Sequence, residues 1–259
     1  MKTWKKVCLW LLVPPVLLAA AAAWFLWGGI SNPAGRKTIG DIAVPAGYQR
    51  VAVDSGSFGE FLRNFPLERC WTRIRYYDGS LAYCQYLGYA VLDLPVFGPD
   101  EQCADVAMRL QAEYLWSQGR YGEIRFRSVN GENLPYTGGS DRKAFERYLR
   151  KVYGKANTAS LRKQLGQKPV TDIAPGDVLV YTDPDFYGHA VTVVDVAVNR
   201  KTGAVAVLLA EGSMPAQSAH IARNITRPFF SPWMKLDLED SCLLASGFLH
   251  FDRSDLRSW

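Results

Sequence analysis

Two valine-rich segments in the second half of the chain restrict its fold more than any other feature. Residues 190–198 and 204–210 are almost entirely apolar, and the connection between them, Asn199-Arg200-Lys201-Thr202-Gly203, is polar and ends in glycine. Segments rich in β-branched residues predict strands, and a short polar connection predicts that they pair as an antiparallel hairpin. In that register residue 189 lies opposite residue 213, so His189 and Glu211 become close or diagonal neighbours.

The remaining pattern places helices mainly before residue 170 and strands after it. Helices are expected at about 101–118 behind Asp100, at about 140–153 behind Ser140, and briefly behind the capping-box residues Ser57 and Glu60. Strands are expected at 48–53, 123–129, 178–181 and 248–251, together with a hairpin of 71–77 and 81–87 around Asp78-Gly79. Helices followed by antiparallel strands predict the α+β class.

The N-terminal segment has the pattern of a membrane anchor. Lys2, Lys5 and Lys6 precede an apolar run of 24 residues from Val7 to Ile30. This run exceeds the roughly 7–15 apolar residues of a cleavable signal peptide and the about 20 needed to cross the hydrocarbon core. We therefore expect residues 1–30 to form an uncleaved transmembrane helix in the inner membrane, with cleavage and secretion as the less favoured alternative.

This anchor would set the location and organisation of the rest of the chain. Lysines before a transmembrane segment remain on the cytoplasmic side, so the domain is expected outside the cytoplasm, in the periplasm or at the cell surface. Residues 31–45 are rich in Gly, Pro and small polar residues and are expected to be a linker. Residues 46–259 are expected to form one globular domain, since about 210 residues are enough for one core and marginal for two.

Charge and cysteine content exclude some classes of partner. The formal net charge is only +5 at pH 7 and no run of five like charges occurs, so we expect no nucleic-acid partner.

Cys8 lies in the N-terminal segment, and the domain carries Cys70, Cys84, Cys103 and Cys242. No CxxC pair or zinc-spaced Cys/His cluster is present, so neither a metal nor a cofactor is expected. Disulfide pairing in the domain is left open.

Cys103 is the candidate nucleophile. With Asp100 as the N-cap it falls in the first turn of a helix, where free backbone N–H groups and the positive end of the helix dipole favour a thiolate. Ala107, Leu110 and Tyr114 share its helical face. This apolar face is expected to pack on the sheet, which puts the sulfur at the helix–sheet junction. The alternative is a small buried cysteine in the core.

His189 is the candidate general base. It follows Gly188 at the beginning of the valine-rich strand, where a glycine lets another group approach the imidazole. Glu211 is the candidate residue that orients this imidazole, and Ser213 and Gln217 are alternatives for that role. Asp195 is excluded because six residues of strand extend roughly 20 Å. The alternative for His189 is an exposed histidine in the preceding loop.

The order of these residues resembles that of the CHAP-type and NlpC-type cysteine hydrolases, which have a papain-like fold. The resemblance is carried by Gln102-Cys103, Pro175-Gly176-Asp177, Gly188-His189-Ala190-Val191 and Ala210-Glu211-Gly212. It implies a helix packed on an antiparallel sheet, a catalytic set of Cys103, His189 and Glu211, and a contribution of Gln102 to an oxyanion hole. The separation of 86 residues between Cys103 and His189 is longer than in the compact members of those families.

Other stretches resemble a bacterial family catalogued only as a domain of unknown function. They are Pro45-Ala46-Gly47-Tyr48, Gln102-Cys103-Ala104-Asp105, Met108-Arg109-Leu110, Ala112-Glu113-Tyr114-Leu115, Met214-Pro215-Ala216-Gln217 and Ser231-Pro232-Trp233. This likeness extends over nearly all of the chain beyond the expected linker.

Two functions follow from these resemblances. The first is a cell-envelope cysteine hydrolase that cleaves an amide bond, with peptidoglycan stem peptides as the implied substrate and partner. The second is a non-catalytic envelope binding or scaffold domain on the same fold. A disulfide from Cys103 to Cys70, Cys84 or Cys242 would exclude the first, because the nucleophile must be a free thiolate.

Overall fold

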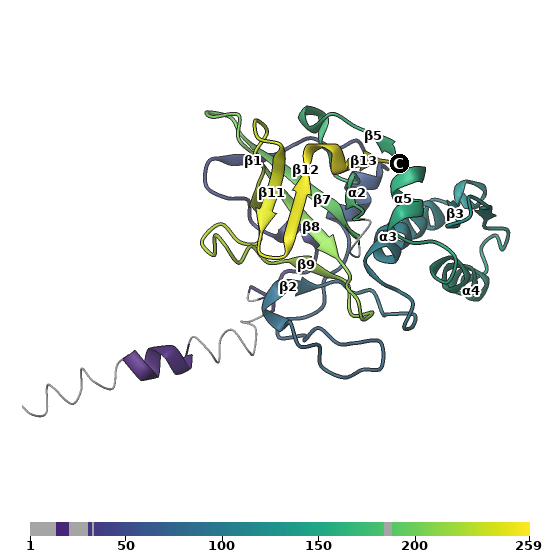
Figure 1. Cartoon of the computed structure of the whole chain (residues 1–259), viewed down its shortest axis with the longest axis horizontal. Helices are drawn as coiled ribbons and strands as arrows, with labels where there is room; N and C mark the ends of the chain where they lie inside the picture. Colours follow the sequence, from purple (N-terminus) through teal and green to yellow (C-terminus); the bar gives the residue numbers. More distant parts are fainter. Residues whose placement is uncertain (1–13, 21–30, 33, 184–187) are drawn as a thin grey trace, which may run out of the picture.

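A nine-stranded antiparallel sheet forms the centre of the computed structural model, which describes residues 14–20, 31–32, 34–183 and 188–259 (Figure 1). Seven strands follow one another in the order β2-β9-β8-β7-β6-β13-β5, while β1 pairs with β7 and β10 with β8. The strands of this sheet are β1 (Tyr48–Arg50), β2 (Gly88–Val91), β5 (Gly166–Gln167), β6 (Val178–Tyr181), β7 (His189–Asn199), β8 (Val205–Glu211), β9 (His220–Ala222), β10 (Met234–Lys235) and β13 (Leu256–Ser258).

The predicted valine-rich hairpin is confirmed as the pair β7 and β8. Thr192 lies opposite Ala210 and Val193 opposite Leu209, which is the register expected from the sequence. An irregularity between Val193 and Asp195 shifts the pairing farther along the hairpin. At the open end of the hairpin, His189 begins β7 and Glu211 ends β8. The hairpin therefore presents these two side chains at one edge of the central sheet.

Four helices accompany the sheet. They are α2 (Phe58–Arg63), α3 (Cys103–Ser117), α4 (Arg142–Tyr153) and α5 (Thr158–Gln164). Five short 3-10 helices occur at Ile39–Asp41, Gln85–Leu87, Tyr121–Glu123, Val170–Asp172 and Arg253–Asp255. Ser57 caps α2 as expected, whereas Asp141 rather than Ser140 caps α4 because its carboxylate accepts hydrogen bonds from the N–H groups of Lys143 and Ala144.

Apolar side chains cover both faces of the central hairpin, which explains its nearly continuous hydrophobicity. On one face Val194 and Leu208 pack in a core that also contains Val106 and Leu110 of α3. On the other face Val193 packs in a core shared with two further strands, β11 (Cys242–Ser246) and β12 (Leu249–Asp252). These two strands pair with each other and not with the central sheet (Figure 1). A second separate pair is formed by β3 (Arg125–Arg127) and β4 (Asn133–Pro135).

A charged residue, Asp195, lies in the interior of β7. Asp195 is fully buried, and its carboxylate pairs with Arg50 at 2.5 Å and Arg63 at 2.8 Å. Arg50 belongs to β1 and Arg63 to α2, so the pairs connect three elements that are distant in sequence. This confirms that Asp195 is remote from the His189 end of the strand.

The expected papain-like fold behind a transmembrane helix is wrong. Antiparallel strands dominate the structure and few helices accompany them.

Among the described residues, no helix is both long and apolar enough to cross a membrane. Residues 1–13 and 21–30 of the expected anchor, including Cys8, lie outside the described residues, and the helix over 14–20 extends only about 10 Å against a hydrocarbon core of about 30 Å. Two expectations depended on that transmembrane helix, namely the inner membrane as a partner and a membrane-anchored location outside the cytoplasm. Both are wrong for the same reason.

Two segments also differ from their expected form. Ile39 and Ile42, in the segment expected to be a linker, are 0% and 1% exposed and belong to the core. The hairpin expected around Asp78-Gly79 is reduced to a bridge between Arg75 and Leu81. The backbone of residues 75–77 forms hydrogen bonds with residues 216–218 instead. The N–H of residue 77 donates to the carbonyl oxygen of Ala216, and the N–H of residue 218 donates to that of Arg75.

Candidate active site

Cys103 is the first residue of α3. Gln102, and not Asp100, is the N-cap, and its backbone N–H donates to Oδ2 of Asp105 at 3.0 Å. The N–H groups of the first helical turn have no partner within the helix, so they are directed beyond its end, where the Cys103 side chain begins. The expectation that Cys103 lies in the first helical turn is therefore confirmed, although the cap is two residues nearer than predicted.

The sheet brings a histidine and a carboxylate to this helix end. Nε2 of His189 lies 3.0 Å from Oε2 of Glu211 across the open end of the β7–β8 hairpin. Cys103 and His189 line the same cavity, and the interaction of the imidazole with the thiol lowers the pKa of Cys103. Since Nε2 of His189 is held by Glu211, Nδ1 is the nitrogen available to the thiol. The three residues selected from the sequence thus meet in the order thiol, imidazole and carboxylate.

These contacts determine the protonation of the set. Burial acts to raise the pKa of the Cys103 thiol, but hydrogen bonds from His189, the Ala190 backbone and Thr158 bring it below the ordinary thiol value. Burial acts to lower the pKa of His189, whereas its hydrogen bonds with Cys103 and Glu211 raise it to about 10. Burial likewise opposes the negative charge of Glu211, yet its two histidine neighbours lower its pKa to about 2. At neutral pH the set therefore contains an imidazolium and a carboxylate, and the Cys103 thiol is shifted towards the thiolate.

A cavity of about 730 Å³ opens in front of the thiol. Its lining includes the three residues above, Gln102, and the two alternative orienting residues, Ser213 and Gln217. Neither Ser213 nor Gln217 is a hydrogen-bonding partner of His189 among the described contacts, so Glu211 is the orienting residue. Met214 and Phe248 also line the cavity, and they are 49% and 70% exposed.

Two glycines allow close approaches of the backbone around the site. A Cβ atom on Gly212 would lie 2.6 Å from Cγ2 of Val106 and 3.2 Å from the carbonyl oxygen of Gln102, so α3 could not rest so near the end of β8. A Cβ atom on Gly188 would lie 2.5 Å from the carbonyl oxygen of Tyr181. Both glycines adjoin a site residue, and at both positions a larger residue would clash with neighbouring atoms.

Two residues of the site were missed or misjudged from the sequence. His220, to which the sequence assigned no role, is 1% exposed, and its Nε2 lies 3.3 Å from Oε1 of Glu211. Thr158, at the beginning of α5, places Oγ1 4.0 Å from Sγ of Cys103. Strand β9, which carries His220, is three residues long and has no recognisable periodicity. Only the pairing of Glu211 with His220 across β8 and β9 reveals this contact.

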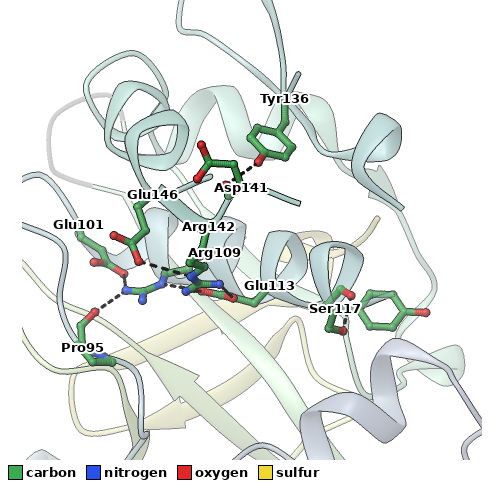
Figure 2. Close-up of polar contacts among 10 residues, drawn as sticks. Pro95, Glu101, Arg109, Glu113, Ser117, Tyr136, Asp141, Arg142 and Glu146 are labelled. Atoms are coloured by element: carbon green, nitrogen blue, oxygen red, sulfur yellow. Dashed lines mark hydrogen bonds and ion pairs between the residues drawn. The ribbon is translucent and has the colours of Figure 1, made fainter. Parts of the chain in front are cut away.

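A buried ionic network fixes the beginning of α3. Arg109 is 1% exposed, and its Nη1 donates to Glu101 at 2.6 Å and to the carbonyl oxygen of Pro95 at 2.7 Å (Figure 2). Its guanidinium also lies 3.6 Å from the ring centroid of Phe97. Glu113 joins Arg109 to Arg142 of α4. Because Glu101 is two residues before Cys103, this network holds the segment that leads into the site.

A smaller cavity of about 110 Å³ lies behind the same helix end. Oδ1 of Asp105 and the hydroxyl of Tyr153 border it, and neither has a hydrogen-bonding partner. Burial raises the pKa of the Asp105 carboxyl well above its ordinary value. A shift in this direction favours the neutral carboxyl, which places no negative charge beside Cys103.

The described cysteines are free. Cys70, Cys84, Cys103 and Cys242 form no disulfide, so the condition that would exclude a cysteine nucleophile is not met among them.

Cys242 lies with His250 and Asp252 on the β11–β12 pair, and their donor atoms are within 4.8 Å of one another. These donor types are suited to zinc, but the group takes no part in the site around Cys103. The expectation of no metal and no cofactor stays a prediction.

Comparison with known proteins identifies a family. No curated protein and no solved structure matches the chain. The comparisons thus give no support to the resemblance to CHAP-type and NlpC-type hydrolases. One family model matches residues 40–139 and 137–258, which together include most of the chain, and it confirms the resemblance to a domain of unknown function. The chain therefore belongs to the family described as domain of unknown function (4846).

Proposed function

We propose that this protein is a cysteine hydrolase that cleaves an amide bond with Cys103 as the nucleophile. The observation that carries the proposal is the 3.0 Å contact of His189 with Glu211 in a cavity of about 730 Å³ that Cys103 also lines. A thiolate beside an imidazolium that a third residue orients is the arrangement required for acyl transfer to cysteine.

The first half of the reaction forms a thioester. The Cys103 thiolate attacks the carbonyl carbon of the substrate, and the negative charge moves to the carbonyl oxygen. The N–H groups at the beginning of α3 and the side chain of Gln102, which lines the cavity beside Cys103, are the proposed oxyanion donors. When the carbon–nitrogen bond breaks, the His189 imidazolium gives its proton to the leaving amine. Glu211 keeps the imidazole directed at the sulfur throughout.

The second half releases the acid. His189, now neutral, takes a proton from a water molecule while that water attacks the thioester carbon. The carbon–sulfur bond breaks, the carboxylic acid leaves, and Cys103 and His189 return to their charged forms. No atom or electron is required beyond the substrate and one water molecule.

The cavity supports a peptide-like substrate with an apolar group near the scissile bond. Met214 and Phe248 are exposed at 49% and 70% and line the cavity with the site residues. Exposed apolar side chains beside a polar site favour a substrate that buries them. Peptidoglycan stem peptides, the substrate implied by the sequence resemblance, are the first compounds to assay.

The test begins with the reactivity of Cys103. The full chain is alkylated with iodoacetamide from pH 4 to pH 10, and labelled peptides are identified by mass spectrometry, with His189→Ala as the comparison. Cys103 is expected to label below pH 7 in the wild type and only at higher pH in the variant, because the imidazolium stabilises the thiolate. Cys242 is the internal control, since burial and neighbouring carboxylates raise the pKa of its thiol.

Turnover is then assayed on stem peptides and on a panel of peptide amides, with Cys103→Ala as the inactive control. A Cys103 that labels no earlier than Cys242, or equally with and without His189, would remove the basis for a hydrolase. The protein would then be treated as the non-catalytic binding domain that the sequence left as the alternative.

A further inference from the structure

We infer that the site is a set of four alternating charges in which His220, as a buried imidazolium, balances Glu211 and positions it for His189. The inference rests on the proposed function and extends it to the residue behind the catalytic three. In this arrangement Cys103 and Glu211 carry the negative charges, and His189 and His220 carry the positive ones.

Each ring nitrogen of His220 faces an oxygen atom that attracts a proton. Nδ1 lies 3.0 Å from the carbonyl oxygen of Ser218, and a carbonyl oxygen can only accept, so Nδ1 carries a proton. Nε2 lies 3.3 Å from Oε1 of Glu211, in the geometry of an ion pair rather than of an aligned hydrogen bond. A bare lone pair on Nε2 would be repelled by the carboxylate, whereas a protonated Nε2 is attracted. A histidine with both protons is an imidazolium.

Burial makes the balance of charge necessary. His220 and Glu211 are only 1% and 8% exposed, and an isolated charge at such a position is strongly unfavourable. A cysteine hydrolase whose orienting residue is an amide has a neutral thiolate–imidazolium pair. With Glu211 in that position, the set of Cys103, His189 and Glu211 has one excess negative charge. His220 supplies the missing positive charge.

The surroundings of His220 offer few other ways to balance that charge. Its ring approaches Gly88 of β2 closely, since a Cβ atom there would lie 3.2 Å from Cδ2 of His220. Its neighbours from that side are the apolar Ile74 and the strand residue Val91, which faces it in the β2–β9 register. The nearest cation along β9 is Arg223, which donates from Nε and Nη2 to the carbonyl oxygen of Gly88. Glu211 is the carboxylate that His220 contacts.

The two histidines also fix the orientation of Glu211. Oε1 faces His220 and Oε2 faces His189, so the carboxylate plane is held from both sides. His220 and His189 both line the cavity, but the His220 side chain is only 1% exposed, against 21% for His189. We therefore assign His220 as a positioning residue that acts through Glu211, with no contact to substrate.

A double-mutant cycle tests the charge balance without a known substrate. The full chain and its variants His220→Gln, Glu211→Gln and the double variant are alkylated across pH, and the midpoint of Cys103 labelling is measured by mass spectrometry. Thermal unfolding of each variant is recorded in parallel. Gln is chosen at both positions because it keeps hydrogen-bonding capacity and removes only the charge.

The charge balance predicts a specific pattern. His220→Gln should raise the midpoint of Cys103 labelling by about one pH unit, which is a tenfold change in thiolate at a fixed pH. Adding Glu211→Gln should reverse most of this shift, because the two buried charges are then removed together. Recovery of folding in the double variant, should His220→Gln alone unfold, would equally support the inference.

Other outcomes overturn it. A midpoint unchanged by His220→Gln, or a double variant shifted as far as His220→Gln alone, would show that His220 is neutral and only fills space. Failure of the proposed function has a different signature, since Cys103 would then label no earlier than Cys242 already in the wild type.

Discussion

Gly212→Ala should separate the cysteine from the histidine by adding a single methyl group. The new Cβ atom would lie 2.6 Å from Cγ2 of Val106, whereas apolar carbon atoms rest about 3.5–4.0 Å apart. The helix must therefore move from β8 by about 1 Å. Val106 cannot turn aside easily because a β-branched side chain in a helix has one strongly preferred rotamer. The other close atom, at 3.2 Å, is the backbone oxygen of Gln102, which moves only with the helix end itself.

The magnitude follows from this displacement. Overpacking of this kind costs roughly 1–3 kcal/mol, which lowers the melting temperature of a chain of this size by roughly 2–12 °C. A shift of about 1 Å between catalytic groups can cost about 100-fold in rate. We expect Gly212→Ala to remain folded at 25 °C while the rate of Cys103 alkylation at pH 7 falls towards that of a free thiol.

Thermal unfolding and the alkylation rate of Cys103 measure the two effects, and Gly154→Ala is the matched control. A Cβ atom on Gly154 would meet no atom nearer than 3.9 Å, and its φ of −76° suits any residue. If Gly212→Ala melts and alkylates like Gly154→Ala, the contact between α3 and β8 does not set the geometry of the site, and the argument fails.

Three further outcomes are expected. Arg109→Met should destabilise the chain by about 3–5 kcal/mol in urea unfolding, because it leaves the buried Glu101 without its cationic partner. Arg120→Ala, at an exposed pair with Glu123, should leave the unfolding midpoint unchanged. Because the pKa of His189 is raised, its ion pairs stabilise the fold fully below about pH 6.5, and this stability is lost as pH rises through about 10. The unfolding free energy of His189→Ala should therefore decline less over that pH range than that of the wild type. The lowered pKa of Glu211 gives the opposite pH dependence. Its contribution to stability is present above about pH 4.5 and is lost as pH falls towards about 2. Acid unfolding followed by circular dichroism should therefore be less sensitive to pH in Glu211→Gln.

Much of the site could be predicted from local patterns. The valine-rich segments predicted their own pairing to within one residue, because strand pairing around a short connection leaves little freedom. The irregularity between Val193 and Asp195 restores the expected register at the open end, where His189 lies next to Glu211. The position of Cys103 at a helix beginning followed from polar residues ahead of an apolar helical face. These signals are strong because each depends on residues that are close together in sequence.

The errors share a physical cause. Residues 1–30 were expected to form a transmembrane helix from hydrophobicity alone, while the described part of this segment is a helix over residues 14–20. Strands as short as β5, β9 and β10 have no periodicity to recognise, and they exist because longer neighbours offer them edges to pair with. The fold therefore contains more sheet than local patterns indicate.

The sequence by itself determined the central hairpin, the helix that begins at Cys103, and the order of Cys103, His189 and Glu211. Tertiary structure alone decided that His220 is buried behind Glu211 and that Gly212 lets the helix reach the sheet. It also decided that Arg109 is enclosed by Glu101 and Phe97. The difference has one reason. Local patterns report how a segment pairs with its own neighbours, whereas the charge and space around a buried side chain are set by segments that meet only when the whole chain has folded.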